Sequence, residues 1–501
     1  MSSNGHQRNK ELGDVAPEVF RKHLHELADW IADYRENIGS YRISPAAPPG
    51  TIRAALPKTA PEDGEPLGEI IADIDRVVMP GVMHWAHPDF MGYFGATTTA
   101  PGILAEMVAG ALNVNAMTWR TSPVATELET VVLEWLQDWL GLTSDFQGVV
   151  YDTASISTMH ALAAAREEAA SSVRARGISG RDEIPMFRIY TSDQAHSSVD
   201  KAAIALGLGE ENVRRIASDS EFRMEVKALR QAIAADLRDG FKPLAVVATV
   251  GTTSTAGVDP VSEIAAVCRE HQMWLHIDAA YGGGLAVVPE CEWVKAGWNE
   301  ADSLVVNPHK MLFVPFDFSA LYVRDIKRLR DVFTLVPEYL RGDAAGAEIN
   351  YMDYGVQLGR RFRALKAWMV WRTFGRAGIA ARIREHLRLA RLFTSWIEDD
   401  ARFEVAAPTV MGVVCFRIKA RDDASADRAN SRAVEIINAS GQGYLMQTKL
   451  RGRTVMRLGL GNILTTEENV RHAWEIVQRT VDDLAPVIGA VAAAHNLAAS
   501  E

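Results

Sequence analysis

Lys310 is the only formally charged residue in the stretch SLVVNPHKMLFVPF, residues 303–316, and its neighbours there are mostly apolar. The nearest acidic residues along the chain, Asp302 and Asp317, flank the stretch instead of lying beside the lysine. Burying an unpaired ammonium is costly, and a lysine avoids the cost by lowering its pKa or by forming an imine with an aldehyde. A lone lysine beside a strand end is more often a surface residue whose stem covers apolar neighbours. The interpretation therefore depends on what accompanies it.

Three other stretches hold groups that suit one aldehyde cofactor, pyridoxal phosphate. Asp278, in HIDAAYGG, is a candidate partner for a pyridine nitrogen that must stay protonated to accept electrons. His196, in DQAHSS, is a candidate stacking residue for a flat ring. Three residues of DTASIST precede an Ala-rich stretch, and a helix start with hydroxyls and amides binds phosphate; they are Thr153, Ala154 and Ser155. Together with the buried lysine, these groups predict a pyridoxal phosphate site.

Each of these residues also has an ordinary structural interpretation. A buried aspartate is more often a hydrogen-bond anchor, a hydroxyl before a helix is most often an N-cap, and His196 is equally compatible with a core histidine. His276 and His309 raise the alternative of a metal site, but neither has the HExxH or Cys/His spacing of zinc sites. We predict no metal, because the order and joint placement of the residues favour the cofactor.

Five short apolar stretches indicate the strands that must position these groups: 148–151, 187–191, 243–250, 274–278 and 303–306. Short continuous apolar strands that alternate with helices are typical of a parallel sheet covered on both faces. In such sheets ligands bind beyond the carboxyl ends of the strands. The candidate residues follow these ends, so the sheet is predicted to bring them into one polar pocket.

The chain is predicted to divide into three parts. Residues 1–99 contain a helical stripe, Phe20 to Tyr34, followed by Pro/Gly-rich connections, and read as a dimerisation arm that wraps a partner subunit. Residues 100–375 form the large cofactor-binding α/β domain, and residues 376–501 form a small α+β domain. A helix from Ser122, its expected N-cap, to Gly141, its expected stop, opens the large domain. Its predicted buried face consists of Leu128, Val132, Trp135 and Trp139.

Composition narrows the class of protein. The 501 residues are 48% hydrophobic and 23% charged, which is typical of a soluble globular protein. A net charge of −11 disfavours nucleic acid and anionic membrane as partners, because both need a basic surface. Three scattered cysteines, an N-terminus without a signal peptide and the absence of a membrane-length apolar run predict a soluble, cytoplasmic protein.

The motifs resemble one family closely, the group II pyridoxal-phosphate decarboxylases, and within it the aromatic-L-amino-acid decarboxylases. The stretches HWAHPDFMGYF, SPVATELETVVLEWL, DQAHSSVDKA, VVATVGTTSTAGVDP, WLHIDAAYGG, NPHKM and LGRRFRALKAW match in order, over roughly residues 15 to 480. The resemblance implies the fold of the PLP-dependent transferases of fold type I, which is aspartate aminotransferase-like. It also implies a homodimer with active sites at the subunit interface.

The resemblance assigns roles to individual residues. Lys310 becomes the Schiff-base lysine, Asp278 the partner of the ring nitrogen and His196 the stacking histidine. Other cofactor contacts are implied for Thr249 and Ala280 at the ring, and for Thr153, Ala154, Ser155, Asn307 and His309 on the phosphate side. Asp152 and Ile156 depart from the common GSASE pattern, which puts details of that cradle in question.

The resemblance also implies the reaction. The substrate amine displaces Lys310, CO₂ leaves, and Tyr339 protonates the carbon left behind. Tyr339 lies in VPEYLRGDAAGAEIN, which reads as a mobile lid, and it matches a loop tyrosine supplied by the neighbouring subunit. Relatives with phenylalanine there tend to make aldehydes. The residues that match the substrate side are Tyr93, Phe94, Asn115, Met117, Trp119 and Gly359.

The expected reaction is decarboxylation of an aromatic L-amino acid to an arylalkylamine, with tryptophan favoured over phenylalanine, tyrosine or DOPA. The absence of an evident cationic cluster disfavours glutamate, and Gly359 allows a large ring. Two alternatives are an aromatic aldehyde synthase on the same fold and a silent dimer that retains the scaffold for binding. Production of hydrogen peroxide and ammonia would favour the synthase, and a colourless protein would favour the silent scaffold.

Overall fold

A seven-stranded sheet forms the centre of the molecule in a computed structural model that describes residues 13–95, 97–335 and 348–484. Its strand order is β1-β7-β6-β5-β4-β2-β3. The strands are β1 (Gln147–Tyr151), β2 (Phe187–Ser192), β3 (Val213–Ile216), β4 (Lys242–Thr249), β5 (Trp274–Asp278), β6 (Ser303–Val306) and β7 (Ser319–Val323). Strand β7 runs antiparallel to β1 and β6, and the other neighbours pair in parallel. The mostly parallel sheet is confirmed, whereas the sequence did not reveal β3 and β7.

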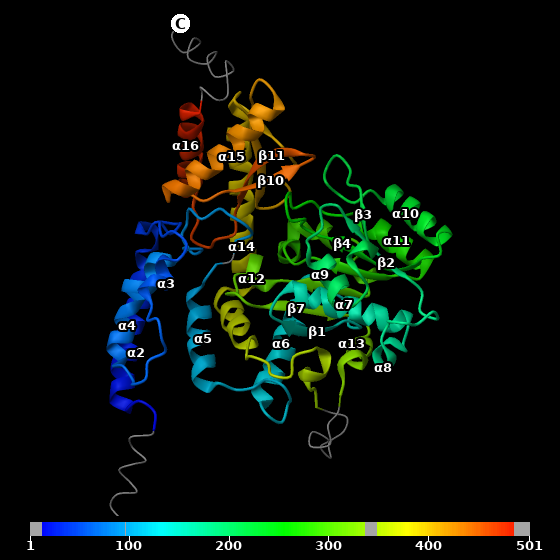
Figure 1. The fold of residues 1–501 in the computed structure, drawn as a ribbon, viewed down its shortest axis with the longest axis horizontal. Helices are drawn as coiled ribbons and strands as arrows, with labels where there is room; N and C mark the ends of the chain where they lie inside the picture. Colours follow the sequence, from blue (N-terminus) through cyan, green and yellow to red (C-terminus); the bar gives the residue numbers. More distant parts are fainter. Residues whose placement is uncertain (1–12, 96, 336–347, 485–501) are drawn as a thin grey trace, which may run out of the picture.

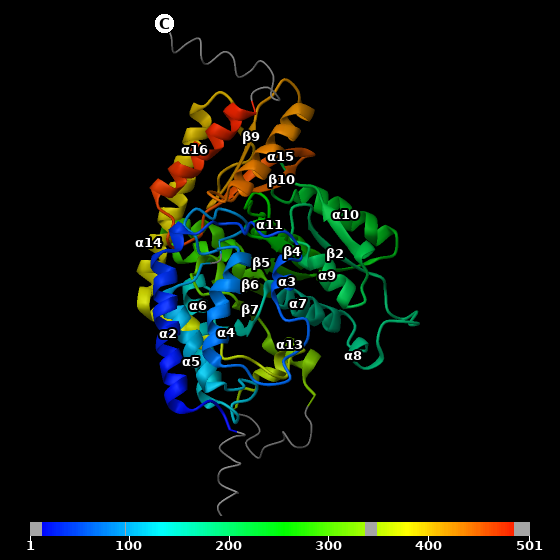
Figure 2. The same ribbon diagram turned by 60° about the vertical axis from the view of Figure 1, so that its left-hand side comes forward.

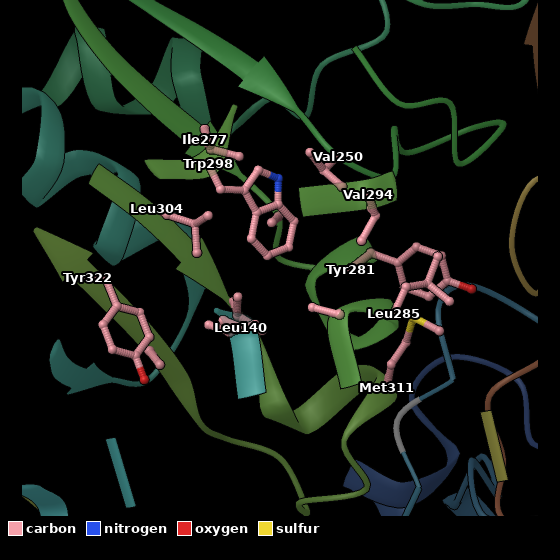
Figure 3. Close-up of a cluster of buried hydrophobic side chains, with 14 of the residues drawn as sticks. Leu140, Val250, Ile277, Tyr281, Leu285, Val294, Trp298, Leu304, Met311 and Tyr322 are labelled. Atoms are coloured by element: carbon pink, nitrogen blue, oxygen red, sulfur yellow. The ribbon is translucent and has the colours of Figure 1, made fainter. Parts of the chain in front are cut away.

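Helices cover both faces of this sheet (Figure 1). On one face lie α7 (Ala154–Ala169), α9 (Ser198–Ala205) and α13 (Ile326–Phe333), which share one apolar core with the strands. On the other lie α6 (Pro123–Leu140), α10 (Val226–Arg238) and α11 (Val261–His271). Figure 3 shows part of this second core, where Leu140 of α6 and Trp298 pack against Ile277, Leu304 and Tyr322 of the strands. Continuous apolar strands therefore reflect burial on both faces.

Helix α6 confirms the predicted caps and part of the predicted face. The Ser122 hydroxyl accepts a hydrogen bond from Ala125 N–H, and Gly141 ends the helix in the left-handed region at φ 68°. The buried face carries Ala125, Glu129, Val132, Leu133, Leu136 and Leu140, whereas Leu128, Trp135 and Trp139 are only partly buried. The most buried face also includes Glu129, which is paired with a buried arginine and which a hydrophobic pattern cannot predict.

The elements that follow the large sheet along the chain form a second unit with its own apolar core. Helix α14 (Ala364–Asp399) leads into an antiparallel sheet of order β10-β11-β9-β8, covered by α15 (Asp423–Ser440) and α16 (Glu467–Asp483). The strands are β8 (Phe403–Val405), β9 (Val413–Ile418), β10 (Met446–Leu450) and β11 (Arg453–Gly459). Gly375 interrupts α14 with φ 63°, next to the boundary predicted at 376. The three domain boundaries themselves stay predictions.

The N-terminal helices lie along one side of the molecule, away from α8 (Val173–Arg176) and α10 (Figures 1 and 2). They are α2 (Pro17–Glu36), α3 (Thr51–Ala55) and α4 (Leu67–Asp73), followed along the chain by α5 (Ala100–Leu112). The apolar stripe predicted on α2 is partly exposed in the single chain: Phe20 is 57% exposed and Leu24 is 37% exposed. No helix among the described residues is both long and apolar enough to span a membrane.

Candidate active site

The carboxyl ends of four neighbouring strands converge on one cavity of about 330 Å³. Asp278 ends β5, Thr249 ends β4, His196 follows β2, and Asn307 follows β6 immediately before α12 (Pro308–Met311). Of the residues predicted from the sequence, the cavity is lined by Tyr93, Phe94, Thr153, Ala154, Ser155, His196, Thr249, Asp278, Ala280, Asn307, His309 and Lys310. The structure therefore brings the predicted cofactor residues together at the edge where parallel sheets bind ligands.

Lys310 reaches this cavity from the first turn after β6. Burial lowers the pKa of its ammonium, Asp278 partly offsets that effect, and Arg457 lowers the pKa further. Among the described residues no carboxylate forms an ion pair with it; its ammonium instead lies 4.9 Å from the centre of the Phe94 ring. A lysine with a lowered pKa holds more of the neutral amine that attacks an aldehyde.

Asp278 faces the same cavity and is 6% exposed. One of its carboxylate oxygens accepts a hydrogen bond from Ala280 N–H at 3.1 Å. No arginine, lysine or histidine in the described ranges forms an ion pair with it. A carboxylate held in this way is a suitable partner for a cationic ring nitrogen.

Two histidines have their tautomers set by the backbone. Ser198 N–H donates to His196 Nδ1 at 3.1 Å, and Phe318 N–H donates to His309 Nδ1 at 2.9 Å. In the neutral form each ring therefore carries its proton on Nε2. Desolvation lowers the pKa of both rings, to about 3 for His309, so both are neutral at pH 7. Each presents one N–H donor and no charge.

The start of α7 forms the phosphate side of the cavity. Ala154 and Ser155 occupy its first turn, where N–H groups lack partners within a helix. Nearby, Asn307 Oδ1 and Thr249 Oγ1 are buried without a hydrogen-bond partner. The N–H groups of the helix start fit an anion, the Thr249 hydroxyl can donate to a polar group of the attached ring, and Asn307 Oδ1 can only accept a hydrogen bond. The residues present are therefore compatible with pyridoxal phosphate.

Asp152 adds a negative charge beside this cradle. Its Oδ1 accepts from Thr153 N–H at 2.6 Å and from the Thr153 hydroxyl at 3.2 Å. No cation among the described residues pairs with Asp152. The carboxylate thus occupies two donors at the helix start that a phosphate would otherwise be free to use.

Arg457, from β11, is a lining residue that the sequence did not reveal. It is 4% exposed, and it donates to Tyr93 O from Nη1 at 2.6 Å and to Ser254 O from Nε at 3.0 Å. Its Nη2 is buried without a partner, and it has no ion pair within the described residues. Such a guanidinium offers a site for a carboxylate. Nothing in the local sequence TVMRLG marks it, because its partners come from other segments.

Asp259 holds the end of one strand that lines the cavity, and the sequence did not predict this role. Its two oxygens accept hydrogen bonds from Met224 N–H at 2.7 Å and Thr249 N–H at 2.8 Å. Burial raises the pKa of this carboxyl to about 7, although the two backbone donors oppose the rise. Asp259 therefore anchors the end of β4, and with it Thr249.

A second unpredicted support holds the end of β1. Glu129 Oε1 accepts from Val150 N–H at 3.0 Å and from Arg360 Nη2 at 2.6 Å. Arg360 also donates to the carbonyl oxygens of Val150 and Ala116. This buried ion pair links α6 and the segment after Gly359 to the strand that precedes the phosphate cradle.

Four predicted substrate residues do not line the cavity within one chain: Asn115, Met117, Trp119 and Gly359. Asn115 Oδ1 accepts from Arg360 N–H at 3.0 Å, and its Nδ2 lies 3.5 Å from Met117 Sδ. Trp119 Nε1 donates to Glu127 at 2.9 Å. Asn115, Met117 and Trp119 lie in the connection between α5 and α6, whereas Gly359 lies in the segment before α14 and close to Asn115. Tyr339 lies outside the described residues.

Comparisons with known proteins agree with this geometry. A family model described as the pyridoxal-dependent decarboxylase conserved domain matches residues 49–419. The aromatic-L-amino-acid decarboxylase of Catharanthus roseus is 34% identical over 499 residues, which cover 96% of this chain and 98% of that protein.

Solved structures match over nearly the whole chain. The crystal structure of Oryza sativa TDC with PLP and tryptamine superposes with a TM-score of 0.90 at 34% identity, covering 94% of this chain and 99% of that one. The 4-hydroxyphenylacetaldehyde synthase of Rhodiola rosea superposes with a TM-score of 0.87 at 31% identity, covering 94% and 99%.

Proposed function

The chain belongs to the pyridoxal-dependent decarboxylase family, and we propose that it converts an aromatic L-amino acid to the arylalkylamine and CO₂. It is a carboxy-lyase that uses pyridoxal phosphate. One observation carries the proposal: the half-buried Lys310 and the buried Arg457, neither with an ion-pair partner among the described residues, share a cavity with Asp278. An amino acid brings one amine and one carboxylate to such a site.

The chain's own groups suggest how the cofactor is held. Lys310 attaches it covalently through the amine, and Asp278 keeps its ring nitrogen protonated. The first turn of α7, Asn307 and the Nε2–H of His309 hold the phosphate. When bound, the cofactor supplies an acceptor for the electron pair that remains when the carboxylate departs.

Arg457 is the proposed anchor of the substrate carboxylate, and its free Nη2 is the donor. His196 covers the ring and presents one neutral N–H. Of the lining residues that the structure describes, Lys310 and Arg457 are the only lysine and arginine, and both are already assigned. A second, distal carboxylate would find no cation, which favours an aromatic over an acidic substrate, with tryptophan first. Tyr93 and Phe94 add aromatic surface on the substrate side.

A homodimer with shared active sites is part of the proposal. The exposed apolar residues of α2 and α5 support it, because Phe20, Leu104 and Leu112 are each more than half exposed in the single chain. In the dimer, Asn115, Met117, Trp119 and Gly359 would reach the cavity of the other subunit. A cytoplasmic location is supported by three cysteines that are all free and buried.

The decisive experiment is a panel of L-amino acids incubated with the holoenzyme and scored for amine and CO₂ by mass spectrometry. We expect equal amounts of both products from aromatic substrates and none from glutamate. Release of amine only from a non-aromatic amino acid would overturn the substrate class. A colourless protein that releases no amine after loading with pyridoxal phosphate would instead favour the silent scaffold.

An aldehyde synthase is the second candidate, supported by the similarity to the Rhodiola rosea enzyme. Tyr339 as proton donor favours the amine instead. Tyr339→Phe is expected to keep the cofactor colour and to divert product to aldehyde, with O₂ consumed and ammonia and hydrogen peroxide released. An unchanged yield of amine in that variant would remove Tyr339 from the reaction.

A further inference from the structure

Phe94 contacts both cations of the cavity with a single ring. The centre of the ring lies 4.9 Å from Lys310 Nζ and 4.7 Å from Arg457 Cζ. The Tyr281 ring stacks against it with centroids 3.9 Å apart. Lys310 and Tyr281 lie in segments that follow β6 and β5 of the large sheet, whereas Arg457 belongs to β11 of the small sheet. Phe94 therefore lies where the two parts of the active site meet.

The backbone leaves this ring little freedom. Tyr93, just before it, has φ 52°, and its carbonyl oxygen accepts from Arg457 Nη1 at 2.6 Å. Gly95, just after it, passes so close to Gly461 that an added Cβ would lie 2.7 Å from that glycine. The loop is thus attached on both sides of Phe94 to the strand and turn that carry Arg457.

The charges around the Phe94 ring indicate a role for it. Before the cofactor is attached, two cations in one cavity repel each other, and Arg457 contributes to the lowered pKa of Lys310. Neither has a carboxylate ion-pair partner among the described residues. The face of an aromatic ring attracts cations, and the attraction strengthens when the cation is desolvated. The Phe94 ring lies close to both cations, at 4.9 Å from Lys310 Nζ and 4.7 Å from Arg457 Cζ.

We propose that Phe94 is a positioning residue that sets the guanidinium of Arg457 relative to Lys310, so that the amine and the carboxylate of an amino acid are received together. The inference rests on the proposed function and goes beyond the sequence-based expectation that Phe94 only contacts the substrate ring. A wall residue contributes equally to every ligand with the same ring. A residue that positions Arg457 contributes most to ligands that carry a carboxylate.

Two ligands with the same indole ring separate these roles: indole-3-propionate, which has the carboxylate without the amine, and tryptamine, which has the amine without the carboxylate. Dissociation constants are measured by calorimetry on the holoenzyme. In Phe94→Leu we expect indole-3-propionate to bind about tenfold more weakly and tryptamine to change by less than about threefold. The ratio of the two constants is the quantity that decides.

The matched control is Tyr93→Leu, because Tyr93 also lines the cavity while neither cation lies over its ring. Here both ligands should weaken together and the ratio should stay unchanged. Phe94→Tyr keeps a ring and should keep the wild-type ratio. Phe94→Met serves as a second ringless variant if the leucine variant does not fold, and thermal unfolding checks each protein.

An unchanged ratio in the ringless variants, beside an active wild type, overturns the positioning role and leaves the proposed function intact. A wild type that releases no amine from any aromatic amino acid refutes the proposed function, and this inference with it. A selective loss of indole-3-propionate binding in both ringless variants, with the cofactor absorbance unchanged, supports the inference.

Discussion

Lys310 and Lys366 are both enclosed lysines, yet their surroundings differ. Lys366 is 2% exposed, and its ammonium lies 2.6 Å from a carboxylate oxygen of Glu106. Lys310 faces a cavity, and among the described residues it has an aromatic ring and a second cation as neighbours instead of an ion pair. The arginines repeat the contrast, because Arg360 is paired with Glu129 and Arg457 is paired with no carboxylate in the described chain.

The comparison shows that burial alone does not indicate chemistry. Burial lowers the pKa of both lysines, so that shift does not distinguish them. The distinction is the counter-charge. A buried ion whose partner belongs to the same chain is part of the framework, whereas one without a partner is available for a ligand.

The largest expected effect comes from substituting each of the two lysines in turn. Lys310→Ala should abolish the cofactor colour and all release of amine while the protein stays folded. Lys366→Met should keep colour and turnover but lose about 1 kcal/mol of unfolding free energy, because Glu106 loses one of its two cations and keeps Arg361 at 2.7 Å. Absorbance, amine assays and urea unfolding measure the three quantities. Turnover in Lys310→Ala would break the comparison.

Substitution of the two arginines should also separate a loss of activity from a loss of stability, with smaller effects on activity. Arg457→Gln is expected to reduce kcat/KM about 100-fold, equivalent to about 3 kcal/mol, with unfolding free energy within about 1 kcal/mol of wild type. Arg360→Gln should cost about 3–5 kcal/mol of stability, because Glu129 would remain buried without its cation. Steady-state kinetics and denaturant unfolding of both variants provide the check. A stability loss in Arg457→Gln equal to that of Arg360→Gln would contradict the distinction.

The buried carboxyl group of Asp259 extends the comparison to the pH dependence of stability. Asp259 accepts hydrogen bonds from backbone N–H groups and has no ion-pair partner among the residues that the structure describes, and burial raises its pKa to about 7. The folded protein then keeps a proton between about pH 4 and 7 that the unfolded chain, with a carboxyl pKa of about 3.9, releases. Stability should therefore fall as pH rises through this window.

Asp259→Asn removes the titrating group, so wild type should lose unfolding free energy relative to this variant between about pH 4 and 7, by at most about 1.4 kcal/mol per pH unit. Denaturant unfolding at several pH values measures the difference between the two proteins. A difference independent of pH would show that Asp259 stays ionised.

The smallest expected effect concerns Asp152 at the phosphate cradle. Asp152→Asn removes a negative charge beside the proposed phosphate position, and pyridoxal phosphate should bind about two- to fivefold more tightly. The apoenzyme can be titrated with the cofactor and followed by tryptophan fluorescence. Weaker binding in the variant would mean that the carboxylate organises the helix start instead of competing with the phosphate.

The sequence by itself indicated the chemistry at the strand ends. Lys310, Asp278 and His196 could be recognised because strand–helix alternation is a local pattern, and parallel strands necessarily bring their carboxyl ends to one edge. The caps of α6 followed from Ser122 and Gly141 for the same local reason. Periodicity did not predict β7, because an antiparallel return strand looks like any short apolar run.

Only the tertiary structure decided which charged groups are paired. Arg457, Glu129 and Asp259 have unremarkable sequence neighbours, and their partners come from segments far away along the chain. Whether a cation is neutralised depends on long-range packing and on the loss of water around it. For that reason the sequence determined where the reactive groups gather, and the packing of the small sheet against the large one decided which of them have no direct ion-pair partner among the described residues.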